Sequence, residues 1–461
     1  MNCIFLCVFF QEDYVKLLLL LLESIFIYGN LDDNTEIVVY TSLEFMNKIK
    51  QSNLYNQDKI KFVINDTYNT IDRACKARLD VFKLPLIENY DKILYLDTDI
   101  IIKGDINAVF DICRDDVIYA LEEGTIDDPD DFWGKTLFTD EELSMYEDKS
   151  AFTTGILLFN NSLTLKDFFD KVNIDASIRS NSFHDQGYLI YNAFRYNLYE
   201  NKTLKSLAIN RSDDVNSDKT IFHFAGGPGY PSGKLTAMTD FLKRAKDITI
   251  MNCINETKEY INKYLLPIIF NCGEKLEGNI FMVHHTTDYS DVFLDKCKNI
   301  SSLVLNKNIK NVMEIGFNSG FSTLLMLISN PKLRVTCFDL GEHRYTLPCF
   351  KQIRETFGYD RVQIIIGDSA KTLPKVSISP NTPFDRYFDL VHIDGCHNPN
   401  IAKSDIENSY RLSKSGTILI MDDYDCHDLK QLWDHFINYY KLKPLDIQLY
   451  DSPYHDIKFI P

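Results

Sequence analysis

Two aspartates follow a short apolar run in the first quarter of the chain. Ile93-Leu94-Tyr95-Leu96 leads directly into Asp97-Thr98-Asp99. Carboxylates just beyond the carboxyl end of a buried strand lie where open α/β sheets bind ligands. Two hard oxygen ligands at that position suit Mg²⁺ or Mn²⁺ bound against a diphosphate. Taken alone, the triplet also fits a solvated turn after a strand, so its surroundings decide between the two readings.

A second acidic group follows two later apolar runs. Asp394 comes after Val391-His392-Ile393, and Asp422-Asp423 come after Ile420-Met421. The carboxyl ends of parallel strands meet at one edge of a sheet, so we expect these three carboxylates to converge. Three acidic ligands suit Mg²⁺, which binds two neighbouring acceptor oxygens and lowers the pKa of a hydroxyl to be modified. The doublet alone fits a capped turn better than a metal site, but the addition of Asp394 favours the metal site.

A histidine near the second acidic group is the candidate general base. His397 lies three residues after Asp394, and a reference pKa of about 6.5 suits proton removal near neutrality. His427 is the competing candidate, whereas His284-His285 is expected to be part of a loop.

A glycine-bearing turn precedes the second acidic group. Residues 312–322 are expected to form a strand, a turn with Gly316 and Gly320, and the start of a helix. Such a turn lets the backbone approach a ligand and offers helix-start amides. Asn318 in the turn tolerates left-handed backbone. Asp339 ends the next strand about twenty residues later, in a place to accept hydrogen bonds from ribose hydroxyls.

Short strands and longer helical segments alternate on both sides of the chain's middle, which predicts parallel sheets flanked by helices. The expected strands are 4–10, 36–40, 60–64, 92–96, 311–315, 334–338, 362–366, 390–393 and 417–421, and the expected helices include 14–28, 78–84 and 241–266. Residues 122–148 are acidic and lack an apolar period, which indicates a loop or lid. A dense turn cluster runs from Gly226 to Gly233.

The chain of 461 residues is long enough for two domains. We predict an α/β fold with two doubly wound domains, at residues 1–245 and 276–461, joined by a helical linker at 246–275. No internal repeat is found.

Composition limits the partners and the compartment. The net charge of −17 would repel a phosphate backbone, so nucleic acid is not an expected partner. Eleven cysteines without a C-x-x-C pair indicate a reducing compartment, and we expect a cytoplasmic protein, in the host cytoplasm if the chain is viral. The leucine run at 17–22 is too short to span a bilayer core of about 30 Å. The oligomeric state stays open.

The first acidic motif belongs to an ordered set. Arg78-Leu79 and a helical segment precede Lys92–Asp99, and Phe152-Thr153-Thr154-Gly155-Ile156, His184-Asp185-Gln186-Gly187 and Phe222-His223-Phe224-Ala225-Gly226 follow. Over residues 1–240 the set resembles glycosyltransferase family 8, the glycogenin-like retaining transferases with a GT-A-like nucleotide-sugar-binding fold. Thr153 stands where that family usually has Asn.

The resemblance implies roles for individual residues. Asp97, Asp99 and His223 would bind Mn²⁺ or Mg²⁺, Arg78 would contact the donor phosphate, and Asp185 and Gln186 would lie closest to the sugar. Lys234 follows a longer Gly/Pro loop than is usual in the family and is the candidate diphosphate contact. The implied partners are a nucleotide-sugar donor, expected to carry UDP, and a glycan or glycoprotein acceptor. Standing alone, Arg78 fits a surface cation and His223 a core histidine.

The second half has its own set of motifs. The turn at Gly316, the segment Gly367-Asp368-Ser369 and the second acidic group resemble class I S-adenosylmethionine-dependent methyltransferases, and specifically the metal-dependent O-methyltransferases, over residues 276–461. The resemblance implies S-adenosylmethionine as cofactor and Mg²⁺ at the acidic group. Its implied cofactor contacts are Glu314, Gly316 and Gly320 at the methionine portion, Asp339 at the ribose, and Asp368 and Ser369 near the adenine.

Together these features predict a bifunctional enzyme. One half would transfer a hexose-type sugar from a nucleotide-sugar with retention, and the other would O-methylate a sugar hydroxyl. The alternatives are a single-activity enzyme or glycan-binding scaffold with one degenerate domain, and a methyltransferase whose acceptor is a catechol-like phenol.

Overall fold

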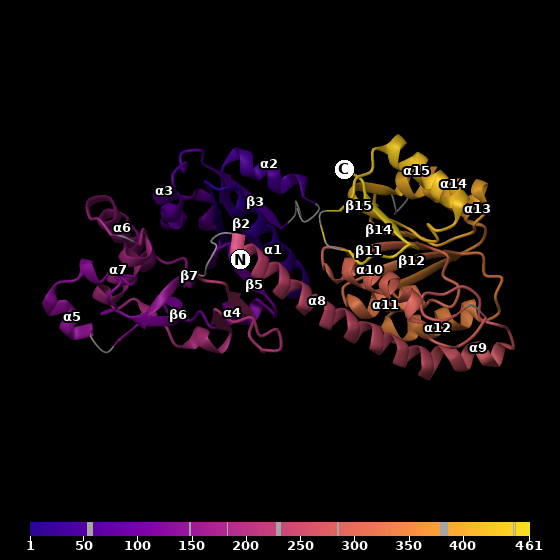
Figure 1. Ribbon diagram of the computed structural model, residues 1–461, viewed down its shortest axis with the longest axis horizontal. Helices are drawn as coiled ribbons and strands as arrows, with labels where there is room; N and C mark the ends of the chain where they lie inside the picture. Colours follow the sequence, from indigo (N-terminus) through magenta and orange to yellow (C-terminus); the bar gives the residue numbers. More distant parts are fainter. Residues whose placement is uncertain are drawn as a thin grey trace. The chain divides into compact units, whose positions relative to one another are not determined.

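The computed structural model describes residues 1–52, 59–146, 149–181, 183–226, 232–283, 285–378, 386–445, 447 and 449–461. The chain divides into two compact units, Met1–Ala245 and Lys246–Pro461 (Figure 1). Each unit is an α/β structure built on its own sheet, which confirms the predicted fold class. Most of the predicted turn cluster, residues 227–231, lies outside the described residues. The same holds for His284, which was expected to be part of a loop.

The first unit contains a seven-stranded sheet in the order β3-β2-β1-β4-β7-β6-β8. Its strands are β1 (Asn2–Val8), β2 (Thr35–Thr41), β3 (Ile60–Ile64), β4 (Lys92–Leu96), β6 (Ile118–Thr125), β7 (Ser150–Asn160) and β8 (Tyr199–Glu200). The strands β3, β2, β1 and β4 are parallel, and β7 runs antiparallel to both β4 and β6.

Both faces of this sheet are buried. In β1, Ile4 and Leu6 belong to one apolar core and Cys3 and Phe5 to another, because successive side chains of a strand point to opposite faces. Strands covered on both sides read as continuous apolar runs, as this one does.

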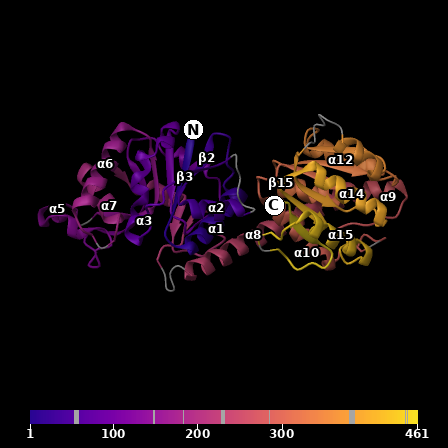
Figure 2. The same ribbon diagram turned by 90° about the horizontal axis from the view of Figure 1, so that it is seen from above.

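The helices of the first unit lie on both sides of the sheet and at one end of the unit. They are α1 (Glu12–Tyr28), α2 (Leu43–Gln51), α3 (Ile71–Lys76), α4 (Asn107–Asp111), α5 (Asp140–Tyr146), α6 (Leu163–Ile178) and α7 (Gln186–Tyr196), with 3-10 turns at Ala77–Lys83, Pro85–Asn89, Lys135–Leu137 and Thr203–Ser206. Leu18, Leu21 and Leu22 of α1 share one apolar core with residues of β1 and β4. Figure 2 shows α5, α6 and α7 gathered at one end of the unit.

A small second sheet completes the first unit and brings distant residues together. It contains β5 (Ile100–Ile102), β10 (Ile221–His223) and β9 (Ala208–Asn210) in the order β5-β10-β9. The strand β10 runs antiparallel to β5, with His223 opposite Ile100. This register places His223 beside the residue that precedes Ile100, which is Asp99.

The second unit has a six-stranded sheet in the order β13-β12-β11-β14-β15-β16. The strands are β11 (Asn311–Ile315), β12 (Arg334–Asp339), β13 (Val362–Ile366), β14 (Phe388–Ile393), β15 (Ser413–Met421) and β16 (Asp456–Phe459). The first five are parallel, as the sequence predicted, and β16 adds an antiparallel edge.

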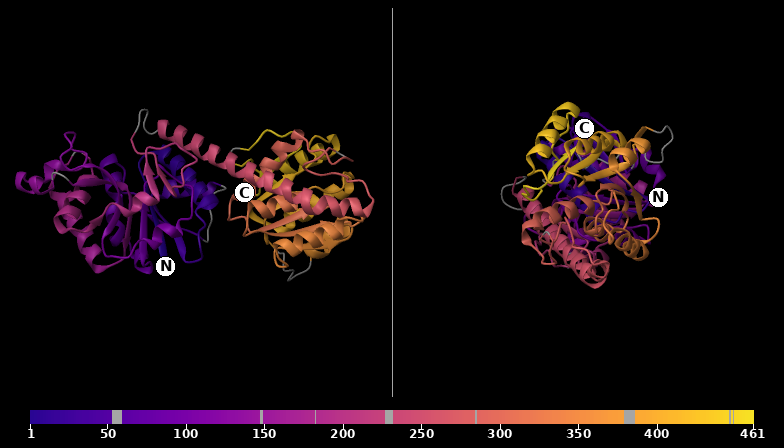
Figure 3. Two further views of the ribbon diagram at one scale, coloured as in Figure 1. Left: turned by 90° about the horizontal axis from the view of Figure 1, so that it is seen from below. Right: turned by 90° about the vertical axis from the view of Figure 1, so that its right-hand side faces the viewer.

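Helices cover both faces of this sheet (Figure 1). They are α8 (Ser232–Tyr260), α9 (Leu266–Cys272), α10 (Leu294–Leu305), α11 (Phe321–Ser329), α12 (Thr346–Phe357), α13 (Ser369–Ile378), α14 (Pro399–Leu412) and α15 (His427–Tyr440), with a π-helical segment at Ile261–Leu265 and a 3-10 turn at Asp291–Phe293. Helix α8 is one unbroken helix in Figure 3 and begins in the first unit.

Several elements differ from the sequence prediction. The segment 78–84, expected to be helical, is a 3-10 turn, and residues 122–146 contain the end of β6 and α5 as well as loop. The segment 246–275, predicted to be a helical linker, contains the end of α8, the π-helical segment and α9, and it lies within the second unit. Among the described residues, no helix combines the length and apolar character that crossing a membrane requires.

Candidate active sites

The first site lies where β4 ends. Asp97 follows the last residue of β4, and its backbone N–H donates to the Gly155 carbonyl of β7 at 2.9 Å. The Asp99 carbonyl accepts the backbone N–H of Phe224 at 2.9 Å, just after β10. Asp97, Asp99 and His223 each turn a ligand atom inward, and these atoms lie within 4.8 Å of one another. Two segments that are far apart in the sequence, at Asp97–Asp99 and at His223, therefore meet here.

The histidine of this group has a fixed orientation. His223 is 4% exposed, and its Nδ1 lies 2.8 Å from Asn210 Oδ1, while its Nε2 lies 3.4 Å from Asp99 Oδ1. An outer-shell oxygen on Nδ1 that leaves Nε2 to face a cation is the usual arrangement of a metal-binding histidine. Nothing in the sequence indicated a role for Asn210, because it comes from β9 and reaches the site only through the small sheet.

Lys234 contacts the first site directly. Its Nζ forms an ion pair with Asp99 Oδ2. Burial opposes ionisation of Asp99, but His223 and Lys234 together hold the pKa of this carboxyl below its usual range. The residue predicted to contact a diphosphate thus lies within the acidic motif.

Arg78 is enclosed beside the first site. Its Nη2 lies 3.1 Å from Asp97 Oδ1, its Nε lies 2.7 Å from Asp185 Oδ2, and its Nη1 donates to the Thr154 carbonyl. The guanidinium also stacks over the Tyr95 ring at 4.6 Å. Arg78 therefore links the acidic motif to Asp185, and a donor phosphate would reach it only alongside these contacts.

Asp185 and Gln186 begin helix α7. Asp185 occupies the N-cap position without a side-chain cap bond, since its carboxylate turns to Arg78. Burial raises the pKa of Asp185 to about 6 against the opposing effect of Arg78. Gln186 accepts from the Thr154 hydroxyl at 3.2 Å and donates to the Phe132 carbonyl at 2.8 Å. The structure thus brings all the residues predicted for this site into one neighbourhood.

The second site is built on the aligned ends of parallel strands. Ile315 of β11 is in register with Phe338 of β12 and with Ile393 of β14, and Ile393 is in register with Met421 of β15. The residues that follow are Gly316, Asp339, Asp394 and Asp422. All four predicted positions therefore lie at one edge of the sheet.

The turn after β11 packs tightly against that edge. Gly316 has φ +93°, and a Cβ there would lie 1.9 Å from the Asp394 carbonyl oxygen. Asp339 Oδ2 accepts the backbone N–H groups of Phe317 and Asn318, both at 2.8 Å. Asp339 thus stabilises the turn, in addition to the ribose contact predicted for it. Asn318 has a backbone φ of +52°, and its side-chain amide donates to the carbonyls of Glu277 and Gly278, both at 2.9 Å.

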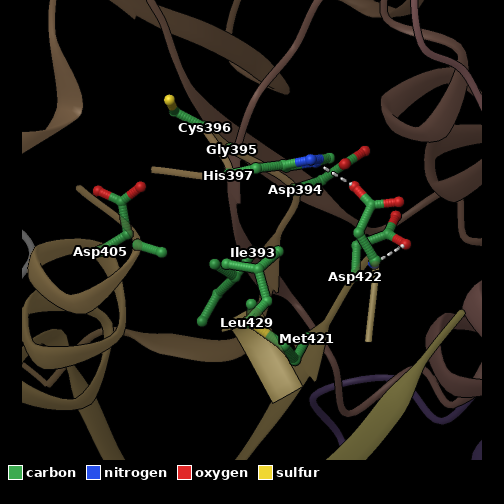
Figure 4. Close-up of a pocket in the computed structure, with 11 residues that line it drawn as sticks. Ile393, Asp394, Gly395, Cys396, His397, Asp405, Met421, Asp422 and Leu429 are labelled. Carbon is green, nitrogen blue, oxygen red and sulfur yellow. Dashed lines mark hydrogen bonds and ion pairs between the residues drawn. The ribbon is translucent and has the colours of Figure 1, made fainter. Parts of the chain in front are cut away.

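The acidic group gathers as predicted. Ligand atoms of Asp394, Asp422 and Asp423 lie within 4.8 Å of one another. Burial raises the pKa of Asp394 to about 7, and the neighbouring Asp422 adds to the shift. His397 Nε2 lies 2.7 Å from Asp423 Oδ2, and this hydrogen bond raises the pKa of His397. In Figure 4, His397 points toward the side where Asp394 and Asp422 lie, and Asp405 lies on the opposite side.

A buried polar network that the sequence analysis missed lies beneath the acidic group. It consists of Lys296, Glu314, His392 and His455 around Asp422. Glu314, predicted to contact the cofactor, is fully buried and accepts from the hydroxyls of Ser322 and Thr323. In the sequence, only His392, a histidine inside an otherwise apolar strand, could have indicated this network. Nothing in the sequence pattern indicated a role for Lys296 or His455.

The remaining predicted residues lie at the periphery. Asp368 caps α13 through the Ala370 N–H at 3.1 Å and pairs with Lys371 at 2.8 Å. Ser369 is the first residue of α13. The competing base His427 lies 2.9 Å from the Gln431 side chain, at the start of α15.

Both sites suit the groups that the sequence implies. A Cβ on Gly155 would lie 2.5 Å from His223 Cε1 and 2.9 Å from Asp97 Oδ2, so this glycine keeps the space between two donors open. Two carboxylates and an imidazole are suitable ligands for Mn²⁺, and three carboxylates for Mg²⁺.

Comparisons with known families agree with this division. Residues 10–200 match the family model described as glycosyl transferase family 8, and residues 313–424 match the one described as methyltransferase domain. The chain therefore carries a glycosyltransferase family 8 domain followed by a methyltransferase domain. Both are transferase domains, so the chain is an enzyme. No curated protein matches the chain.

Solved structures resemble each part of the chain. The bifunctional glycosyltransferase WbbM is 17% identical, with a TM-score of 0.40 over 52% of this chain, which spans 49% of that chain. The galactosyltransferase LgtC is 14% identical, with a TM-score of 0.38 over 53% of this chain and 96% of that one. An O-methyltransferase from Bacillus cereus is 18% identical, with a TM-score of 0.33 over 44% of this chain and 90% of that one.

Proposed function

We propose that the chain is a bifunctional enzyme that transfers a hexose-type sugar from a nucleotide-sugar with retention and O-methylates a sugar hydroxyl of the same or a related glycan. The observation that carries the proposal is the presence of two separate acidic groups, each at the carboxyl edge of its own sheet. One chain that carries both sites raises the effective concentration of the second site for the product of the first.

In the first unit, Asp97, Asp99 and His223 would hold Mn²⁺ or Mg²⁺. A divalent cation bound there would neutralise the charge that develops on the departing nucleoside diphosphate, with UDP as the expected nucleotide. Lys234, which pairs with Asp99, would contact the diphosphate. Asp185, oriented by Arg78, would stabilise positive charge at the anomeric carbon.

In the second unit, the backbone of the turn at Gly316 and Gly320 would hold S-adenosylmethionine, with Asp339 at the ribose and Asp368 and Ser369 near the adenine. Mg²⁺ at the acidic group would lower the pKa of the acceptor hydroxyl. His397 would take the hydroxyl proton on a ring nitrogen, and Asp423 orients its ring through Nε2. The eleven free thiols support the cytoplasm as the compartment.

Ligand binding to the full chain tests the proposal. Calorimetry should detect a UDP-sugar only with Mn²⁺ or Mg²⁺, and S-adenosylmethionine with or without metal. Asp97→Ala together with Asp99→Ala should abolish only the first, and Asp339→Ala should weaken only the second. A chain that binds S-adenosylmethionine but no nucleotide-sugar would instead support the scaffold alternative. Methylation of a catechol in preference to a glycan would support the phenol alternative.

A further inference from the structure

The three carboxylates of the second acidic group have unequal surroundings. Asp394 and Asp423 are partly exposed, whereas the side chain of Asp422 has no exposed surface. Lys296 of α10 places its Nζ 2.5 Å from Asp422 Oδ2, and its own side chain is only 7% exposed. A buried carboxylate needs such a partner, because an unpaired charge in the interior is strongly destabilising.

Asp422 is also held from two further directions. His392 Nε2 of β14 lies 3.4 Å from Asp422 Oδ2, and His455 Nε2 lies 3.5 Å from Asp422 Oδ1. His392 is oriented in turn, since its Nδ1 lies 3.1 Å from Glu314 Oε1. Side chains from a helix, a neighbouring strand and the C-terminal segment therefore fix one carboxylate.

The fixed carboxylate controls the residue that follows it. Asp422 Oδ1 accepts the backbone N–H of Asp423 at 2.7 Å. Asp423 has φ +52°, a left-handed conformation that is uncommon for residues other than glycine and that this hydrogen bond helps to hold. In this conformation, the Asp423 carboxylate faces both His397 and Asp394.

We propose that Lys296 is a positioning residue of the methyl-transfer site. Its ammonium group holds Asp422, and Asp422 holds the backbone of Asp423, so that the Asp423 carboxylate reaches the divalent cation and the candidate base together. This inference rests on the proposed methyl-transfer function. It gives a lysine 126 residues before Asp422, rather than a further acid, control over the geometry of the acidic group.

Mn²⁺ binding to the full chain tests this role without knowledge of the methyl acceptor. The parent chain carries Asp97→Ala and Asp99→Ala, so that the first acidic group no longer contributes to the Mn²⁺ binding measured by electron paramagnetic resonance. In that chain, Lys296→Met should weaken Mn²⁺ binding by about tenfold, the effect typical of outer-shell residues. Affinity for S-adenosylmethionine should stay unchanged, and Lys296→Arg should restore most of the Mn²⁺ affinity.

Lys298→Met is the matched control, because Lys298 lies on the same helix but contacts Asp295, at 3.1 Å, and the Tyr450 ring, at 5.0 Å, neither of which belongs to the acidic group. Tighter Mn²⁺ binding by Lys296→Met would overturn the proposal, since it would make Lys296 a competitor of the cation. Loss of Mn²⁺ and S-adenosylmethionine affinity together, with a lower melting temperature, would reduce Lys296 to a structural role. A parent chain that binds S-adenosylmethionine but no Mn²⁺ would overturn the proposed metal function and this inference with it.

Discussion

In each unit, a lysine of the chain itself contacts a carboxylate of the acidic group. Lys234 pairs with Asp99 and Lys296 pairs with Asp422. The two pairs differ in what lies around them. The Asp99 side chain is 9% exposed and has Asp97 and His223 as neighbours, whereas the Asp422 side chain has no exposed surface. Under the proposed function, the first lysine would meet a ligand and the second would hold a residue.

Gly155→Ala tests how much room the first site requires. The added methyl would lie 2.5 Å from a His223 ring that Asn210 already holds, so the ring cannot move away without losing that bond. We expect Mn²⁺-dependent binding of a UDP-sugar to weaken by about tenfold or more, measured by calorimetry. Binding of S-adenosylmethionine by the same chain is the internal control. Unchanged donor binding would show that His223 is not a ligand.

Asp405 provides a test based on pH. Burial raises the pKa of Asp405 to about 7, with the Ser369 hydroxyl opposing the shift. The pKa of an aspartate in the unfolded chain is about 3.9. Between about pH 4 and pH 7 the folded chain therefore binds one proton more than the unfolded chain, and this proton stabilises the fold. This contribution to stability is complete below about pH 4 and is lost as the pH rises through about 7.

The side chain of Asn at position 405 is neutral at every pH. The melting temperature of the Asp405→Asn variant should therefore rise relative to that of the parent chain as the pH increases from about 5 to about 8. Scanning calorimetry at several pH values measures the difference. The same comparison at exposed Asp360 is the control. A difference that does not change with pH would contradict a buried, protonated Asp405.

At the scale of elements, the ends of strands carry the candidate site residues and were also what the sequence could predict. Buried apolar runs that end in Asp97, Asp339, Asp394 or Asp422 indicate both the strand and its functional edge. Partners that depend on pairing between distant segments gave no such signal. Asn210 reaches His223 through the small sheet, and His455 lies just before β16, an edge strand that the sequence pattern did not indicate.

The turn after β11 can be tested as an element. Gly316→Ala would place a methyl 1.9 Å from the Asp394 carbonyl oxygen, at a φ of +93° that L-residues rarely adopt. We expect lower thermal stability and loss of S-adenosylmethionine binding, because the turn and the end of β14 would have to separate. Gly278→Ala is the matched control, since its nearest heavy atom would be 3.8 Å away. Equal behaviour of the two variants in calorimetry would exclude the turn as the cofactor site.

At the scale of the whole molecule, each unit contains its own core and its own candidate site. Helix α8 contributes Met238, Phe241 and Leu242 to a core of the first unit, and Asp247 of the same helix accepts a hydrogen bond from Tyr450 within the second. We therefore predict that residues 1–245 and residues 246–461, produced separately, each fold in a cooperative transition. Only the first should bind a UDP-sugar with Mn²⁺, and only the second should bind S-adenosylmethionine, as measured by calorimetry and thermal unfolding. The second piece should also keep the Mn²⁺ site at its acidic group, because Lys296, His392 and His455 all belong to it. Two pieces that aggregate separately but recover both activities when produced together would contradict independent folding and would make the chain a single cooperative unit.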